Sequence, residues 1–336
     1  MNKIAKTVLM TGTALCVAGV VLSTAGYFAG GKDFTYTSDH MYVSGGNSSS
    51  RKNLTVMKKE QIDDFTKLNV DFENFDLDIR TSDDDHYYME YKLEKNGRKN
   101  PLTWKDKDGE LTLEESAGGS GSYYITYDLG IFSTHADLTE KKGALNTVIL
   151  YIPEKAQLSE AELQLSDGDL TADQLLCKEM TLELLNGDLM LDKGEFEKFD
   201  AKLSDGDLNV KELQCTDNLQ LKSGNGDVTI KKAELADGQI ALSDGDIQID
   251  NSSFNGDMKI NSSCGDVSVE MKNGSAEKTN IYLKAADGDV DTEGLSGGKT
   301  DNEEDISVYE NKAGASAPTL NVECSDGDIT LTESEK

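Results

Sequence analysis

The chain has 336 residues and carries 63 Asp and Glu against 33 Lys and Arg, which gives a formal net charge of −30. This charge argues against a nucleic-acid-binding protein and against charge attraction to anionic lipid, since both need clustered Lys and Arg. Hydrophobic residues make up 37% of the chain. They follow a regular alternation, which excludes disorder for most of the length.

The N-terminal segment predicts a membrane anchor. Lys3 and Lys6 precede 25 uncharged residues, 7–31. As a helix this stretch would extend about 37 Å, more than the hydrocarbon core of about 30 Å. The alternative is a cleaved signal peptide, whose apolar core has about 7–15 residues, with a small-residue site at 23–25. With either an anchor or a signal peptide, the rest of the chain is exported from the cytoplasm. We therefore expect a single-pass protein of the cell membrane, with its C-terminal domain outside the cytoplasm and both lysines inside.

The most informative feature is a repeat that begins near residue 160. Gly-Asp followed by an aliphatic residue recurs nine times. The glycines are Gly168, Gly187, Gly206, Gly226, Gly245, Gly256, Gly265, Gly288 and Gly327. Leaving Gly256 aside, the spacings are 19, 19, 20, 19, 20, 23 and 39, and the last is close to two periods. A unit of 19–20 residues therefore recurs along the second half of the chain.

Aligning the units on their glycines produces aliphatic columns two and four residues after the glycine and five before it. The column two residues after holds Leu170, Leu189, Leu208, Val228, Ile247, Val267, Val290 and Ile329. The intervening positions are mostly polar, and this period of two is typical of half-buried strands. Short strands, a tight turn and a fixed period predict an all-β fold, a β-solenoid in which like columns stack. Nine coils would make a rod of roughly 40 Å.

The rest of the exported chain is also strand-like. Alternating patterns in 65–72, 75–79 and 87–93 predict N-terminal coils of the same β-structure, and we expect Trp104 in the core of a capping coil. Residues 296–318 break the pattern and predict an irregular coil. The expected organisation is an anchor or signal segment at 1–31, a linker at 32–58, N-terminal β coils at 59–155 and the Gly-Asp solenoid at 156–336.

The cysteines predict no disulfide. Cys177 and Cys215 fall in an apolar column two coils apart, about 9.6 Å, beyond the roughly 7 Å limit between bridged Cα atoms. Cys264 and Cys324 are expected in other columns, several coils apart. No pair has the CxxC spacing, which argues against a zinc site.

The aspartate after each repeat glycine is the candidate metal ligand. In-register stacking would bring these carboxylates to about 5 Å from one another, which raises their pKa or calls for a cation. A calcium ladder would use Asp169, Asp188, Asp207, Asp227, Asp246 and Asp266. The alternative, favoured by turn chemistry, is architectural: Gly supplies a positive φ and Asp caps free backbone N–H groups. The spacing also matches neither the helix–loop–helix calcium loop nor the nonapeptide calcium roll.

Nothing in the sequence predicts catalysis. His40, His86 and His135 all precede the repeat, and residues 99–336 contain no Arg. No Ser/His/Asp or Cys/His arrangement can be built from them. We therefore expect no catalytic residues and no cofactor, apart from Ca²⁺ on the calcium hypothesis. The tyrosine-rich segment 123–127 fits an ordinary amphipathic strand better than a platform that stacks on sugar rings.

The order of segments resembles a known family. The stretch FTKLNVDFENFDLDIRTSDDD is followed by GELTLEE, by NTVILYIPEKAQLSEAELQLSDGDL and by the Gly-Asp units. This order is similar to the putative adhesin family of bacterial β-strand-repeat proteins, which is a domain of unknown function. The resemblance covers about residues 60–336. It implies a bacterial surface or envelope protein with a β-solenoid ectodomain, and it offers no catalytic residues to carry over.

These patterns together predict a non-enzymatic, membrane-anchored extracellular protein, an adhesin-like binding module or an envelope accessory. Its expected partners are the membrane, through the N-terminal helix, and envelope proteins or surface glycans. One alternative is a structural protein whose open solenoid ends stack into filaments, with the charged tail at 333–336 blocking one end. The other is a calcium-dependent carbohydrate-active protein.

Overall fold

The computed structural model describes residues 34–36, 41–43, 54–117, 145–292, 295, 298–303 and 306–334. The chain divides into two units, residues 1–54 with 118–140, and residues 55–117 with 141–336. The predicted anchor at 7–31 and the tyrosine segment at 123–127 lie outside the described residues. In the part of the chain that the structure describes, no helix combines the length and the apolar character needed to cross a membrane.

The described elements are strands together with a short 3₁₀ helix, η2 (Ala276–Lys278). The strands before the repeat are β1 (Phe34–Tyr36), β2 (Met41–Val43), β3 (Leu54–Ile62), β4 (Lys67–Phe72), β5 (Asp76–Ser82), β6 (Tyr87–Glu94), β7 (Leu102–Lys107), β8 (Glu110–Glu115) and β9 (Thr147–Pro153). Those of the central repeat are β10 (Leu158–Asp167), β11 (Leu170–Asn186), β12 (Leu189–Asp205), β13 (Leu208–Asn225), β14 (Val228–Lys231), β15 (Ala233–Asp244), β16 (Ile247–Phe254), β17 (Met258–Cys264) and β18 (Val267–Met271). The C-terminal ones are β19 (Asn280–Ala285), β20 (Val290–Asp291), β21 (Lys299–Glu303), β22 (Ile306–Asn311), β23 (Thr319–Asp326) and β24 (Ile329–Glu333).

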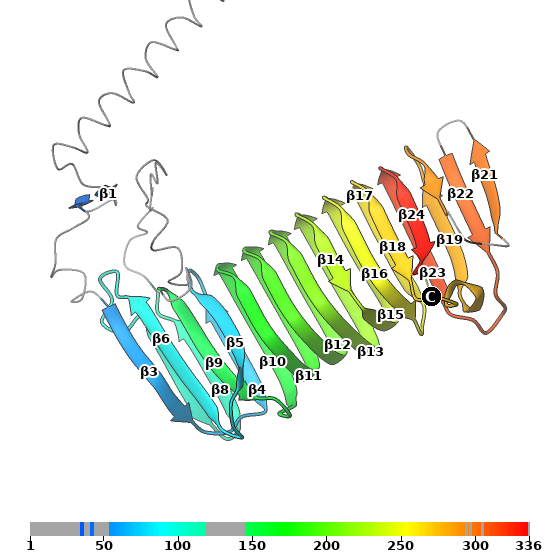
Figure 1. Ribbon diagram of the computed structural model, residues 1–336. Helices are drawn as coiled ribbons and strands as arrows, with labels where there is room; N and C mark the ends of the chain where they lie inside the picture. Colours follow the sequence, from blue (N-terminus) through cyan, green and yellow to red (C-terminus); the bar gives the residue numbers. More distant parts are fainter. Residues whose placement is uncertain are drawn as a thin grey trace, which may run out of the picture. The chain divides into compact units, whose positions relative to one another are not determined.

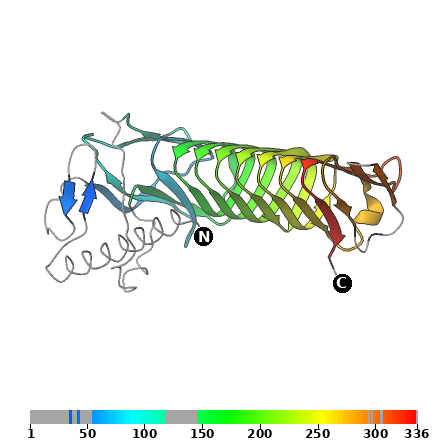
Figure 2. The ribbon, with the colours of Figure 1, turned by 90° about the horizontal axis from the view of Figure 1, so that it is seen from above.

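The larger unit is a stack of parallel β coils, which confirms the all-β solenoid-like fold (Figures 1 and 2). Two rows of strands run along it. The first row, which follows the Gly-Asp turns, is β9, β5, β11, β12, β13, β14, β16, β18, β24 and β20. The second row, which precedes the turns, is β8, β4, β10, β11, β12, β13, β15, β17, β23 and β19. Strands β11, β12 and β13 belong to both rows because each continues round the corner between them.

The aliphatic columns form the core, as the alternation predicts. In the column two residues after the glycine, Leu170, Leu208 and Val228 are each at most 1% exposed. The column that holds Cys177 and Cys215 is equally buried, and Phe196 lies between the two cysteines in register. Because each residue stacks on its equivalent in the next coil, burial on this scale is available only to the assembled stack.

The order of coils at the C-terminal end differs from the chain order. Strands β23 and β24, the last in the chain, pair with β17 and β18 on one side and with β19 and β20 on the other. In Figure 1 the red strands accordingly lie between the yellow and orange ones. The predicted irregular coil at 296–318 contains the antiparallel pair β21–β22, and β22 covers β19. The tail therefore leaves from inside the stack, so the expectation that it blocks a stack end is wrong.

The N-terminal end is built in the same way. The coil formed by β4 and β5 lies between β10–β11 and the later coil β8–β9. Antiparallel strands β6 and β7 then cover β9 and β8, and β3 pairs with β6. Asp108 and Gly109 form the β7–β8 turn with φ of 57° and 79°.

The structure also bears on two further expectations, the position of Trp104 and the linker at 32–58. Trp104, expected in the core, is 37% exposed, although it lies on the same face of the covering strand β7 as the buried Leu102, so this face of β7 is only partly covered. The hairpin β1–β2 and the start of β3 at Leu54 fall within the segment 32–58 that we expected as a linker.

Candidate functional site

The aspartates predicted as calcium ligands form one column along the Gly-Asp turns. In each, Oδ1 accepts the backbone N–H of the equivalent aspartate in the next coil, at 2.8–3.0 Å. In stack order the column is Asp76, Asp169, Asp188, Asp207, Asp227, Asp246, Asp266, Asp328 and Asp289. The carboxylates therefore satisfy turn N–H groups, which is the architectural role that the turn chemistry favours.

The calcium ladder stays a prediction. Within the described ranges, no group of three or more His, Cys, Asp or Glu side chains is placed to hold a metal ion. The same carboxylates have a competing role in the turns, so a test must change the charge while keeping the oxygen that accepts the backbone N–H.

The repeat glycines are required by the close approach of neighbouring coils. A Cβ added at Gly187 would lie 2.2 Å from the carbonyl oxygen of Gly168, and one at Gly226 would lie 2.3 Å from that of Gly206. No real Cβ tolerates such distances. A positive φ adds to this requirement at Gly226 (113°) but not at Gly187. Close stacking is therefore the constraint shared along the column, and the predicted positive φ applies to part of it.

A second polar column lies immediately before the glycines, and it alternates Asp with Asn from Asp167 to Asp244. The Asn186 amide donates to Asp167 at 2.7 Å, and the Asn225 amide donates to Asp205 at 2.5 Å. Because each amide N–H₂ lies against a carboxylate of the coil below, the alternation relieves repulsion between stacked like charges. The surface along the Gly-Asp turns is therefore acidic, and hydrogen bonds between the Asn and Asp side chains of successive coils order it.

An open groove of about 390 Å³ runs along the corner between the two rows, and the sequence analysis did not find it. Its lining is Lys193, Gly194, Glu195, Glu212, Leu213, Gln214, Lys232, Glu234, Asn251 and Lys272. These residues come from five successive coils, so the groove extends about 19 Å along the stack. Extending the aligned columns to six and eight residues after the glycine would have revealed it.

Ion pairs fix the charged side chains of the groove. Lys193 contacts Glu195 at 2.6 Å, and Lys272 contacts Glu234 at 2.6 Å. Lys232 contacts Glu212 of the preceding coil at 2.8 Å. The hydrogen bond that Lys193 donates to Glu195, together with the charge of that carboxylate, raises the pKa of Lys193. Three lysines and three glutamates thus make the groove electrically neutral on a chain of net charge −30.

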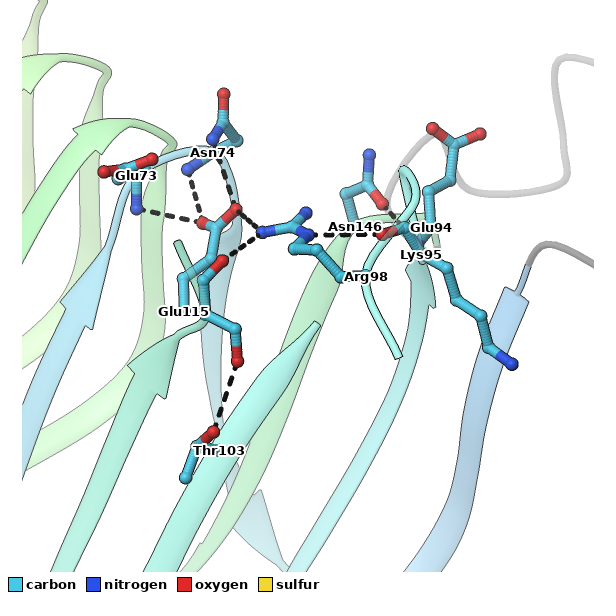
Figure 3. Close-up of polar contacts among 9 residues, drawn as sticks. Glu73, Asn74, Glu94, Lys95, Arg98, Thr103, Glu115 and Asn146 are labelled. Atoms are coloured by element: carbon cyan, nitrogen blue, oxygen red, sulfur yellow. Dashed lines mark hydrogen bonds and ion pairs between the residues drawn. The ribbon is translucent and has the colours of Figure 1, made fainter. Parts of the chain in front are cut away.

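A buried ion pair closes the N-terminal end of the stack (Figure 3). Arg98 Nη1 lies 2.8 Å from Glu115 Oε1, and the two side chains are 8% and 1% exposed. Glu115 Oε2 accepts the backbone N–H groups of Glu73 at 2.9 Å and Asn74 at 2.6 Å, and Arg98 also donates to the Ser116 carbonyl. The backbone engages the hydrogen-bonding atoms of this pair. The pair therefore joins the end of β8 to the segment between β4 and β5 and to the segment between β6 and β7.

Aromatic and cationic side chains meet on the outer face of β3, β6 and β9. Lys59 Nζ lies 3.7 Å from the centre of the Tyr151 ring and 4.9 Å from that of Tyr88. Tyr151 donates its hydroxyl proton to Glu90 at 2.6 Å. Burial, and then this hydrogen bond, raise the pKa of Tyr151. The tyrosine and the lysine both have partners within the protein, so the cluster stabilises the covering strands.

Of the three histidines, the structure describes His86 alone. His86 is exposed, and His40 and His135 lie outside the described residues. Burial raises the pKa of the Cys177 thiol to about 12, which removes it as a nucleophile at neutral pH. Cys264 and Cys324 lie in neighbouring coils rather than several coils apart, because β23 inserts beside β17. Both thiols are free.

Comparison with solved structures finds matches of low sequence identity. A putative adhesin from Parabacteroides merdae is 16% identical, covers 84% of this chain and 97% of its own, and has a TM-score of 0.49. A putative adhesin from Bacteroides fragilis is 11% identical, with 84% and 98% covered and a TM-score of 0.45. A putative lipid binding protein from Parabacteroides distasonis is 13% identical, with 84% and 97% covered and a TM-score of 0.44.

Comparison with curated proteins finds no match. The family model described as Toastrack DUF4097 matches residues 65–332, which include the coils β4–β5 and β8–β9 as well as the Gly-Asp repeat. Since this match spans well over half of the sequence, the chain belongs to the Toastrack DUF4097 family.

Proposed function

We propose that this protein is a non-enzymatic binding module, anchored in the cell membrane by residues 7–31 and displayed outside the cytoplasm. The length of the uncharged segment and the two lysines before it support the anchor and its orientation. The module acts as an adhesin-like binder or envelope accessory, whose partners are envelope proteins or surface glycans.

The observation that carries this proposal is the rigid display of polar side chains along a long stack. Pairs such as Lys202–Glu183 at 2.7 Å and Lys198–Glu179 at 3.2 Å join successive coils. Repeated coils that hold their outward side chains in fixed rows suit recognition of an extended partner. The groove at the corner of the stack is open and charge-balanced, and its resolved pKa shifts favour the charged forms, since Glu195 raises the pKa of Lys193 and Lys232 lowers that of Glu212.

The covered ends of the stack favour a single rod over a filament. The covering strands β7 and β21 expose Lys105, Lys107, Lys299 and Asp301 along their length. Charged, antiparallel covering strands oppose edge-to-edge pairing. We expect a monomer of the full chain in detergent by size-exclusion chromatography with light scattering; concentration-dependent oligomers would favour the filament alternative.

Cell fractionation, surface proteolysis and binding to envelope material test the proposed function. We expect the full chain in the membrane fraction of the cells that make it, with the β coils cleaved or labelled from outside in intact cells. The purified chain should retain material from a preparation of bacterial envelopes. Recovery of the chain in the cytoplasmic fraction, or no retention of envelope material, would contradict the proposal.

A further inference from the structure

We propose that the corner groove binds a neutral, linear polyhydroxylated chain, a glycan lying along the axis of the stack. This inference rests on the proposed function and assigns it a site and a ligand class. The groove crosses five coils, from Lys193 in β12 through Glu212 and Lys232 to Asn251 and Lys272. A chain lying in it meets a new rung of polar side chains about every 4.8 Å.

The charge balance of the groove selects against charged ligands. Each lysine is already within 2.6–2.8 Å of a glutamate, so an anionic ligand would have to displace a carboxylate from each cation that it contacts. The surrounding protein, with a net charge of −30, would repel the same ligand. A cationic ligand would in turn have to displace the lysines. A neutral ligand avoids both costs.

The hydrogen-bonding groups of the groove match hydroxyl groups. Lysine only donates and glutamate only accepts, whereas Gln214 and Asn251 do both. A hydroxyl donates and accepts at once, so neighbouring hydroxyls of a sugar can bridge a Lys–Glu pair without breaking it. Because the ion pairs already hold these side chains in place, less conformational freedom is lost when the ligand binds.

The floor of the groove excludes an apolar ligand as the main occupant. It consists of Gly194 and the buried Leu213, which offer little apolar area. A Cβ added at Gly194 would lie 2.5 Å from the ring of Phe196 and 2.7 Å from Leu191. Both contacts are with buried core residues, so a side chain at position 194 would point into core space that Phe196 and Leu191 already fill, and not into the groove.

Isothermal titration of the full chain with neutral tetrasaccharides tests the proposal. The probes are cellotetraose, chitotetraose and maltotetraose, with tetragalacturonate as the anionic comparison, in a detergent that contains no sugar. The variant Lys232→Met removes a donor from the groove. Lys202→Met is the matched control, because Lys202 forms a similar exposed pair, with Glu183, outside the groove at 2.7 Å. Far-UV circular dichroism verifies that both variants are folded.

We expect at least one neutral probe to bind, with affinity about tenfold weaker in Lys232→Met, the effect of losing one charge-assisted hydrogen bond. Lys202→Met should bind as the unmodified chain does. Absence of binding by every neutral probe, stronger binding of tetragalacturonate, or equal weakening by both variants would overturn the proposal. If Lys232→Met still retained envelope material as well as the unmodified chain, the proposed function would stand and only the groove would be rejected.

Discussion

Aspartate 207 shows how the two readings of the Gly-Asp column can be separated. Its Oδ1 accepts the N–H of Asp227 at 2.8 Å, a contact that asparagine keeps and alanine loses. We expect Asp207→Ala to lower the free energy of unfolding by about 1 kcal/mol and Asp207→Asn to change it little. Denaturant unfolding followed by circular dichroism measures both, with Asp200→Ala on the exposed outer face as control.

Calcium provides a second test of the two readings, through the response of Asp207→Asn. If the column binds Ca²⁺, adding calcium stabilises the native chain by mass action, and Asp207→Asn reduces that stabilisation because a neutral amide is a poorer ligand than a carboxylate. An unfolding midpoint that rises with calcium in the unmodified chain, and rises less in Asp207→Asn, would contradict the purely architectural role.

Asp76, the first residue of the column, should make stability depend on pH. Burial is the main cause that raises the pKa of Asp76, and the charge of Asp169 adds to it. A raised native pKa means that ionised Asp76 disfavours the folded state at neutral pH, and that this cost disappears as pH falls through the native pKa. Asp76→Asn keeps the oxygen that accepts the Asp169 N–H and removes the charge.

We therefore expect Asp76→Asn to be more stable than the unmodified chain at neutral pH, and the difference to shrink in acid. Denaturant unfolding at a series of pH values measures it, with Asp200→Asn as the control for the loss of one surface charge. A difference that grows as pH falls would show that the carboxylate is stabilised by its partners rather than destabilised by burial.

Among the strands, the sequence allowed prediction of the parts that depend on periodicity. The positions of β4, β5 and β6 and the buried columns follow from alternation, because the period of two is a local property. Trp104 could not be placed in this way, since alternation puts it on the same face as the buried Leu102 but does not show how much of that face is covered. The groove was missed because it depends on how polar corner residues of five coils align.

The glycine column also makes a prediction about the strands that it joins. Gly226→Ala should lower the free energy of unfolding by about 2–4 kcal/mol, because the new Cβ meets the Gly206 carbonyl and φ is positive. Gly97→Ala is the matched control: its φ is 80°, but nothing lies within 4 Å of the added Cβ. We expect its cost to stay near 1 kcal/mol. Equal costs in denaturant unfolding would show that φ, rather than close stacking, sets the requirement.

Across the whole stack, the order of the coils is the property that cannot be predicted from the sequence. Each coil presents the same aliphatic columns to both neighbours, so the pattern is compatible with any neighbour. Both ends depart from chain order in the same way: β4–β5 and β23–β24 each lie between coils that are not both their neighbours in sequence. Long-range pairing of this kind depends on loop closure and on the covering strands.

The inserted C-terminal coil should therefore hold the end of the stack together. Ending the chain after Ala317 removes the strands that hydrogen-bond β17–β18 to β19–β20, and no other described pairing joins these two coils. Hydrogen exchange should show loss of amide protection in β19 and β22, with protection retained in β11 and β12. Removing residues 335–336 alone is the control and should leave all of these strands protected. Full protection of β19 after the longer truncation would contradict this prediction. It would mean that β19–β20 can pair directly with β17–β18, and that the inserted coil β23–β24 lengthens the stack without being needed to hold its end together.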